Sequence, residues 1–204
     1  MTLADHVRRL LDLGVPDIAG ISARELTAHV RSLPEEPAAV LALHPRLVSA
    51  RSLAGLVRRG QQEGFVVDDF TDLEEFSPID GVVVPDRPVY LLHAPDRGDD
   101  LRNASPEEAL PVILGRGRTP LTISEGLSWL LQEPDQLEPN HCFMTIASRK
   151  RVGARLDART PALWISGGTG RDGRHRRGAP KVGWCWAGNR HTWLGFASAL
   201  GRSS

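Results

Sequence analysis

The chain has 204 residues, with 25 basic and 25 acidic side chains, 41% hydrophobic residues and 25% charged residues. These values are typical of a globular protein and exclude a largely disordered chain. Apolar runs are only a few residues long, far short of the roughly 20 residues that span a bilayer, so we expect no membrane segment. The N-terminus lacks an apolar signal core. Two cysteines are too few for a disulfide framework and indicate a reducing cytoplasm.

The charge is distributed unevenly along the chain. Residues 1–140 carry thirteen basic and twenty-three acidic side chains, whereas residues 141–204 carry twelve basic and two acidic ones, so net charges of −10 and +10 cancel. The C-terminal stretch also holds four of the five tryptophans and a glycine-dense segment, Ser166 to Gly173. We therefore expect the working surface of the protein in this stretch.

The N-terminus is predicted to be helical. The apolar spacing from Leu3 to Leu11 is typical of an amphipathic helix, and Gly14 would end it. Ser22 and Glu25 then form a capping box, in which each side chain bonds the backbone amide of the other residue. This box predicts a second helix that continues to about Leu33. The prolines at 34 and 37 indicate a boundary after this helical pair.

The middle of the chain alternates short apolar runs with further helix signals. Ser105 with Glu108, and Thr122 with Glu125, repeat the capping-box spacing at the start of two apolar segments. Short apolar runs between turn residues are typical of buried strands. The predicted elements, in chain order, are strand Val40–Leu43, helix Ala50–Arg59 ended by Gly60, strand Pro88–Leu92, helix Ser105–Leu114 and helix Thr122–Gln132.

The pattern then becomes rich in β-strands. Gly188 to His191 are predicted to form the turn of a hairpin that joins the last two strands. Alternation along the first of these strands places Trp184 and Trp186 on one face and Cys185 on the other. The predicted strands are Cys142–Ala147, Ala162–Ile165, Val182–Ala187 and Thr192–Phe196.

Together these elements predict an α+β fold, with N-terminal helices packed on a mostly antiparallel sheet that ends in a Trp-rich C-terminal hairpin. We expect one compact domain over residues 1–204. Its parts would be a helical pair at 1–34, an acidic α/β part at 37–139 and a basic β-rich part at 140–204.

Three segments resemble a bacterial protein family of unknown function. They are the run from Gly115 to Gly126, the block from Thr160 to Ser166, and the stretch from Ala179 to Gly195. The resemblance covers about residues 85–199. It implies a bacterial cytoplasmic protein and supplies no activity, cofactor or catalytic residue.

The segment from Gly168 to Gly173 has the spacing G-x-G-x-x-G of dinucleotide-binding loops. The residues that follow, Arg174 to Pro180, do not form the amphipathic helix on which a pyrophosphate would sit, so we reject that interpretation. Two interpretations of the cationic loop from Gly167 to Gly178 remain open. Its amides and guanidiniums form an anion site, or it is a solvated surface insertion.

Basic side chains are interleaved with tryptophans in the C-terminal part. Cations neutralise phosphates and aromatic rings stack on bases, so this mixture predicts a phosphate-bearing partner, either RNA or a nucleotide. The predicted binding residues are Arg149, Lys150, Arg151, Arg171, Arg174, Arg176, Arg177, Lys181, Arg190, Trp184 and Trp186.

Two alternatives compete with this interpretation. The tryptophans lie at strand spacing, which favours a core position over a binding platform. The basic residues would also find partners in the acidic part of the chain. Those candidate carboxylates are Asp68, Asp69, Asp72, Glu74, Glu75, Asp99 and Asp100.

Other chemistries have weaker signals. His141, Cys142, Cys185 and His191 offer zinc-ligand types, but the sequence has no C-x2-C pair, and we expect no metal and no cofactor. A small-molecule enzyme is one alternative function, with a pocket walled by Trp164, Trp184 and Trp193 and chemistry from His191, His141 or Cys185. A protein-interaction module that self-associates through its segregated charges is another. The sequence leaves the ligand and the oligomeric state open.

Overall fold

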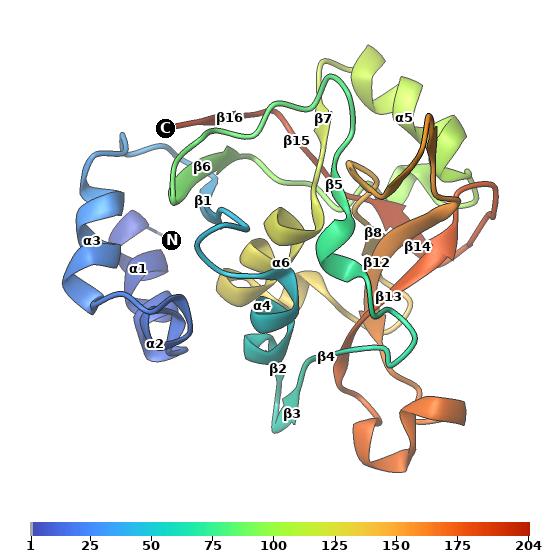
Figure 1. Cartoon of the computed structure of the whole chain (residues 1–204), viewed down its shortest axis with the longest axis horizontal. Coiled ribbons are helices and arrows are strands. Elements are labelled where there is room, and N and C mark those ends of the chain that lie inside the picture. Colours follow the sequence, from blue (N-terminus) through green and yellow to red (C-terminus); the bar gives the residue numbers. More distant parts are fainter. Residues whose placement is uncertain (1) are drawn as a thin grey trace.

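The computed structural model describes residues 2–204. Within them lie the helices α1 (Leu3–Asp12), α2 (Val15–Ala19), α3 (Ala23–Arg31), α4 (Ala50–Leu56), α5 (Pro106–Gly115) and α6 (Ile123–Gln132). No helix in this part of the chain has the length and apolarity needed to cross a membrane. The architecture is α+β, as predicted, with α1 to α3 grouped at one side and α6 in the centre (Figure 1).

The capping boxes set the helix starts. Ser22, Ser105 and Thr122 each accept the amide of the residue three positions later, whose Glu side chain bonds back to the cap amide. Thr2 and Asp5 form a fourth box at the start of α1. These starts are confirmed because a capping box needs only contacts within four residues.

Two helix predictions were wrong. The helix predicted over Ala50–Arg59 ends at Leu56, because Val57 is extended and the chain continues into β2 (Arg58–Arg59), which pairs with β3 (Gln62–Glu63). The N-terminal helical pair is in fact three helices. Gly14 and Gly20, both with positive φ, delimit α2, a helix too short to show a periodic pattern.

Three strands from distant parts of the chain form the first sheet, in the order β1 (Ala39–Leu43), β6 (Val89–His93) and β16 (Gly201–Ser203), all antiparallel. Helix α6 covers the outer edge of β1. The Gln132 amide bonds the N–H and C=O of Leu41 at 2.9 and 2.6 Å, and the Ser128 hydroxyl accepts the Leu43 N–H at 3.0 Å. Buried polar side chains of α6 thus satisfy an edge that would otherwise be unpaired.

The second sheet has five strands in the order β14 (Leu194–Phe196), β8 (Cys142–Met144), β12 (Arg159–Ile165), β13 (Pro180–Trp186) and β4 (Phe65–Val66). The pairs β12–β13 and β12–β8 are antiparallel, while β14–β8 and β13–β4 are parallel. Helix α6 also packs on this sheet, since a Cβ on Gly126 would lie only 3.1 Å from Cδ1 of Leu163 in β12 and 3.2 Å from Cε2 of Phe143 in β8. Every residue of α6 is buried between the two sheets (Figure 1).

The tight hairpin predicted around Gly188 to His191 is not formed. Strands β13 and β14 do not pair, since β12 and β8 lie between them. The hairpin that carries tryptophans is instead β12–β13, paired from Arg159 with Trp186 to Ile165 with Pro180 and joined by the loop of residues 166–179. A local turn signal was misleading here because β13 gains a longer register with β12, and β14 adds to the free edge of β8.

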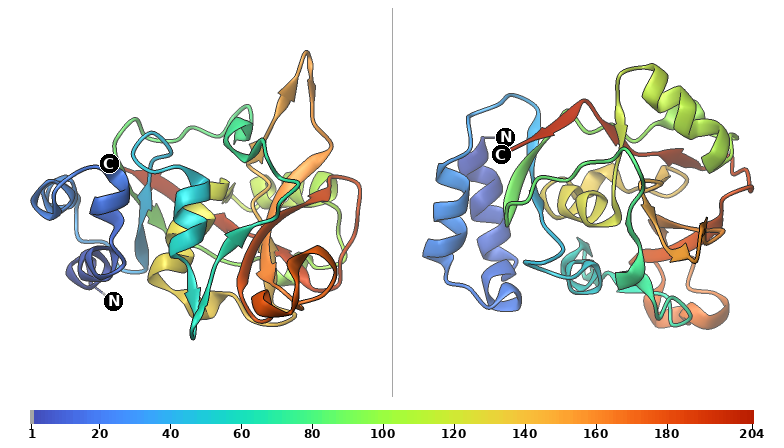
Figure 2. Two further views of the ribbon diagram at one scale, coloured as in Figure 1. Left: turned by 60° about the horizontal axis from the view of Figure 1, so that its bottom comes forward. Right: turned by 45° about the horizontal axis from the view of Figure 1, so that its top comes forward.

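Short strand pairs join the remaining segments. They are β5 (Ser77–Pro78) with β9 (Ser148–Arg149), β7 (Thr119–Pro120) with β15 (Ser198–Ala199), and β10 (Arg151–Val152) with β11 (Arg155–Leu156). The β10–β11 hairpin projects from the body of the molecule (Figure 2). The acidic and basic parts of the chain therefore share both sheets, with β4 in one and β16 in the other.

A buried ion pair fixes the C-terminal strand. Arg202 of β16 bonds both carboxylate oxygens of Glu125 at 2.5 and 2.7 Å, and the Tyr90 hydroxyl donates to the same carboxylate at 2.8 Å. Glu125 is fully buried and the Arg202 side chain is 5% exposed. This capping residue of α6 therefore also connects the helix to strands β6 and β16.

Candidate functional site

Most basic side chains of the C-terminal part are paired with carboxylates. Lys150, for example, lies 2.8 Å from Asp72 and 2.9 Å from Glu75. Besides the pairs of Arg159 and Arg202, further pairs are Arg151–Asp80, Arg171–Asp69, Arg176–Asp68, Lys181–Asp172 and Arg190–Glu108. All of these carboxylates except Asp172 belong to the acidic part of the chain. The charge segregation of the sequence is thus largely neutralised within the molecule.

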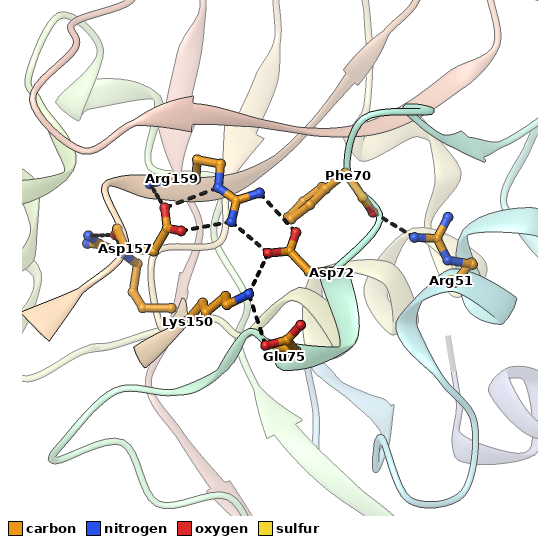
Figure 3. Close-up of polar contacts among 8 residues, drawn as sticks. Arg51, Phe70, Asp72, Glu75, Lys150, Asp157 and Arg159 are labelled. Atoms are coloured by element: carbon orange, nitrogen blue, oxygen red, sulfur yellow. Dashed lines mark hydrogen bonds and ion pairs between the residues drawn. The ribbon is translucent and has the colours of Figure 1, made fainter. Parts of the chain in front are cut away.

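Arg159 is at the centre of the most extensive of these networks (Figure 3). Its guanidinium donates to Asp72 at 2.9 and 2.6 Å and to Asp157 at 2.7 Å. The rings of Phe76 and Trp184 lie 5.3 and 5.9 Å from its central carbon. Hydrogen bonds from Arg159 hold the pKa of Asp72 far below its ordinary value. This network fastens the start of β12 to the acidic part and has no free cation for a ligand.

The strand register divides the tryptophans between two faces of the β12–β13 hairpin. Trp184 stands opposite Pro161 and Trp164 stands opposite Lys181, so the two tryptophans point to opposite faces. The Trp184 and Trp186 rings touch edge to face at 4.7 Å, which confirms that they share a face. The predicted pocket walled by Trp164, Trp184 and Trp193 is therefore wrong in its inclusion of Trp184.

A cleft of about 490 Å³ lies on the Trp164 face of the hairpin. The half-buried rings of Trp164 and Trp193 form its aromatic wall, with centroids 6.1 Å apart and planes at 72°. Trp164 lies across Gly183, where a Cβ would come within 2.3 Å of the indole, so only glycine permits this position. Nζ of Lys181 lies 5.1 Å from the centre of the Trp164 ring.

Two arginines, Arg59 and Arg177, line the same cleft. Gly168 has a positive φ of 69°, and a Cβ there would lie 2.5 Å from Cβ of Arg177, so the loop packs tightly against this arginine. A Cβ on Gly178 would lie 3.8 Å from Nη1 of Arg59, which places that guanidinium beside the loop. Among residues 2–204, neither arginine forms an ion pair or a side-chain hydrogen bond, unlike the paired basic residues around them.

The loop between β12 and β13 is fixed at its base. The Ser166 hydroxyl donates to Asp172 at 2.7 Å and accepts the Gly168 amide at 3.1 Å, while Lys181 donates to both oxygens of Asp172. Burial disfavours the ionised carboxylate, but the hydrogen bonds from Lys181 and Ser166 hold the pKa of Asp172 below its ordinary value. Buried Ser166 and Asp172 thus fix the base of the predicted cationic loop, which contains two short 3-10 turns.

The candidate nucleophiles and bases do not converge in the cleft. Cys142 lines it, but burial raises the pKa values of Cys142 and Cys185 to about 11, so both free thiols are protonated at neutral pH. His141 faces Asp99 at 3.4 Å, while His191 packs against Trp193 with its pKa lowered by burial. Within residues 2–204, no three His, Cys, Asp or Glu side chains are arranged to hold a metal.

The predicted binding residues do not form one continuous surface. Arg177 lines the cleft, and Lys181 contacts its aromatic wall. The adjacent loop carries Arg171, Arg174 and Arg176, and the opposite end of β12 lies near Arg149, Lys150 and Arg151. The other face of the β12–β13 hairpin carries Trp184 and Trp186, and the segment before β14 carries Arg190. The sequence did not indicate Arg59 or Asn140, because only the fold brings them to the cleft.

Comparison of the sequence with known protein families identifies the relatives of this chain. The model of the family of unknown function DUF5701 matches residues 9–204. The chain belongs to this family. The match extends the resemblance seen over residues 85–199 to nearly the whole chain, including the Arg59 segment and the cleft. No curated protein and no solved structure matches the chain. Membership of DUF5701 defines the relatives of the protein and leaves the function to be inferred from the site.

Proposed function

We propose that the protein binds a phosphate-bearing ligand, RNA or a nucleotide, in the cleft between Trp164, Trp193 and Arg177. One observation carries the proposal: the guanidiniums of Arg59 and Arg177, which lack carboxylate partners in the described chain, lie at a cleft walled by two tryptophans. Arginine forks match phosphate geometry, and indole rings stack on bases. Nearby, Arg171, Arg176 and Lys181 are paired with carboxylates, whereas the two guanidiniums of the cleft are available to an anion.

The surroundings support binding more than catalysis. The cysteine thiols are protonated at neutral pH, and His141 points to Asp99 instead of lining the cleft. The proposal includes a bacterial cytoplasmic setting, which the family resemblance and the two free thiols support.

The test is a binding titration by calorimetry and tryptophan fluorescence at about 50 mM salt, where electrostatic association is strong. The ligands are 5′-mononucleotides, pyrophosphate and short RNA. We expect wild type to bind at least one of them. R59A/R177A should lose at least tenfold in affinity, since a hydrogen bond to a charged group contributes about 1.5–3 kcal/mol.

The matched control is R151A/R171A, which removes the same net charge from two exposed arginines outside the cleft. This control should bind like wild type. Absence of binding by wild type would reject the proposal. An equal loss of affinity in both double variants would also reject it, because net charge and not the cleft would then account for the affinity.

A further inference from the structure

The two indole rings of the cleft form a corner and not a platform. Their planes meet at 72° with centroids 6.1 Å apart. Successive bases of a strand stack on rings that present separate, accessible faces. A corner instead accommodates one planar ring, stacked on one indole with its edge against the other. The aromatic wall therefore suits a single base.

The charge around the cleft also suits a single ligand. A groove for a nucleic-acid strand needs a track of free cations that follows successive phosphates. On the adjacent loop, Arg171 pairs with Asp69 at 3.0 Å and Arg176 with Asp68 at 3.5 Å, while Arg174 has no carboxylate partner among residues 2–204 and does not line the cleft. A strand that left the cleft along this loop would meet those carboxylates. Within the cleft lining, Arg59 and Arg177 are the cations without a carboxylate partner in the described chain, and two guanidiniums suffice for one phosphate group.

The dimensions and rim of the cleft also suit one small ligand. Its volume of about 490 Å³ is within the range of pockets that hold one small ligand. Pro139 and Asn140 form the rim as a tight turn, closed by the His141 amide on the Glu138 carbonyl at 2.9 Å, with Asn140 at a φ of 64°. Among residues 2–204 the Asn140 side-chain amide has no hydrogen-bond partner, so its donor and acceptor are available to a base edge.

From these three features we infer that the cleft binds one nucleotide, a nucleoside mono- or diphosphate, and not an RNA strand. The base occupies the corner between Trp164 and Trp193, and the phosphate lies at Arg59 and Arg177. This inference rests on the proposed function and names the ligand class of the same site.

The test is a ligand series titrated into the full chain at about 50 mM salt. It comprises pyrophosphate, ribose 5-phosphate, the four ribonucleoside 5′-monophosphates and diphosphates, and ten-nucleotide RNAs. We expect one nucleotide per chain, bound at least fivefold more tightly than ribose 5-phosphate, because stacking of one base contributes that much or more. The affinity should fall less steeply with salt than that of a polynucleotide, because a mononucleotide has no condensed counterion atmosphere to release.

The failures are distinguishable. If the ten-nucleotide RNA binds more than tenfold more tightly than any mononucleotide, with a steep salt slope, the single-nucleotide inference is wrong and the proposed function stands. If ribose 5-phosphate or pyrophosphate binds as tightly as every nucleotide, the site recognises only the anion, and the inference is again wrong. If none of the phosphates binds, both the inference and the proposed function are rejected.

Variants locate the base. Trp193→Leu should bind nucleotides no better than ribose 5-phosphate, while Trp186→Leu, which alters an exposed tryptophan on the other face, should bind like wild type. Asn140→Gly retains the positive φ of the turn, so it should fold normally and change the preference among the four bases. Unchanged nucleotide binding in both Trp193→Leu and Asn140→Gly would overturn the inference.

Discussion

Arg202→Met tests whether the buried ion pair holds the C-terminal strand on the central helix. In the native protein the Arg202 guanidinium bonds both oxygens of Glu125, and it also donates to Thr119 Oγ1 at 2.7 Å and to the Pro120 carbonyl at 2.9 Å. Methionine fills much of the same volume without the charge. The Glu125 carboxylate, which has no exposed surface, would then be left without its cation.

The expected loss of stability is large. Removal of one partner from a buried pair costs about 3–5 kcal/mol, because the remaining charge is desolvated and unpaired. For a domain of this size, each kcal/mol lowers the Tm by about 2–4 °C, so we expect a fall of roughly 10 °C. Glu125→Gln keeps an acceptor for the α6 cap but removes the charge. The double variant Glu125→Gln, Arg202→Met should therefore lose less than the sum of the two single variants.

Urea unfolding at pH 7, followed by tryptophan fluorescence, and thermal melts measure both effects. Arg190→Met is the matched control, since its pair with Glu108 is about half exposed at both partners and should contribute at most about 1 kcal/mol. If Arg202→Met costs no more than Arg190→Met, the Glu125 carboxylate is not desolvated as described, and the argument is refuted.

Three further predictions concern titration and packing. Because the pKa of Asp72 is lowered in the folded state, its ionised carboxylate stabilises the fold above about pH 4, and this contribution is lost as pH falls below that value. The free energy of unfolding in urea should therefore differ between Asp72→Asn and wild type more at pH 7 than at pH 3. An equal difference at the two pH values would contradict this. The pKa of about 11 for Cys142 and Cys185 predicts iodoacetamide alkylation at pH 7.5 more than about 100-fold slower than for a free thiol, and rapid labelling of either would contradict the burial described. Gly183→Ala should displace the Trp164 ring, changing the near-UV circular dichroism and weakening nucleotide binding, whereas an unchanged spectrum would show that the indole does not lie across this position.

The helices show how far local signals reach. The starts of α3, α5 and α6 could be predicted because Ser22, Ser105 and Thr122 each interact with a residue three positions away. The apolar runs of β1, β6 and β12 likewise indicated strands, and alternation placed Trp184 and Trp186 on a common face. Each of these features depends on neighbours in the chain, so the sequence alone contains the information.

The candidate site depended on tertiary structure in three ways. β14 pairs with β8 and not with β13, so the predicted tight hairpin did not form. Trp164 and Trp184 belong to one hairpin but point to opposite faces, because their register was set by the pairing of β12 with β13. Arg59 reaches the cleft only because the β12–β13 loop folds beside it.

The tertiary structure also determined which basic side chains of the C-terminal part are paired with carboxylates. From sequence alone, the basic stretch was compatible both with a phosphate-binding surface and with internal pairing with the acidic part. Lys150 and Arg159 meet Asp72 across 78 and 87 positions of the chain, and Arg176 meets Asp68 across 108. Composition fixes how many charges of each sign a chain carries. Which of them remain free for a ligand depends on distances of a few ångströms between side chains that only the packed fold brings together.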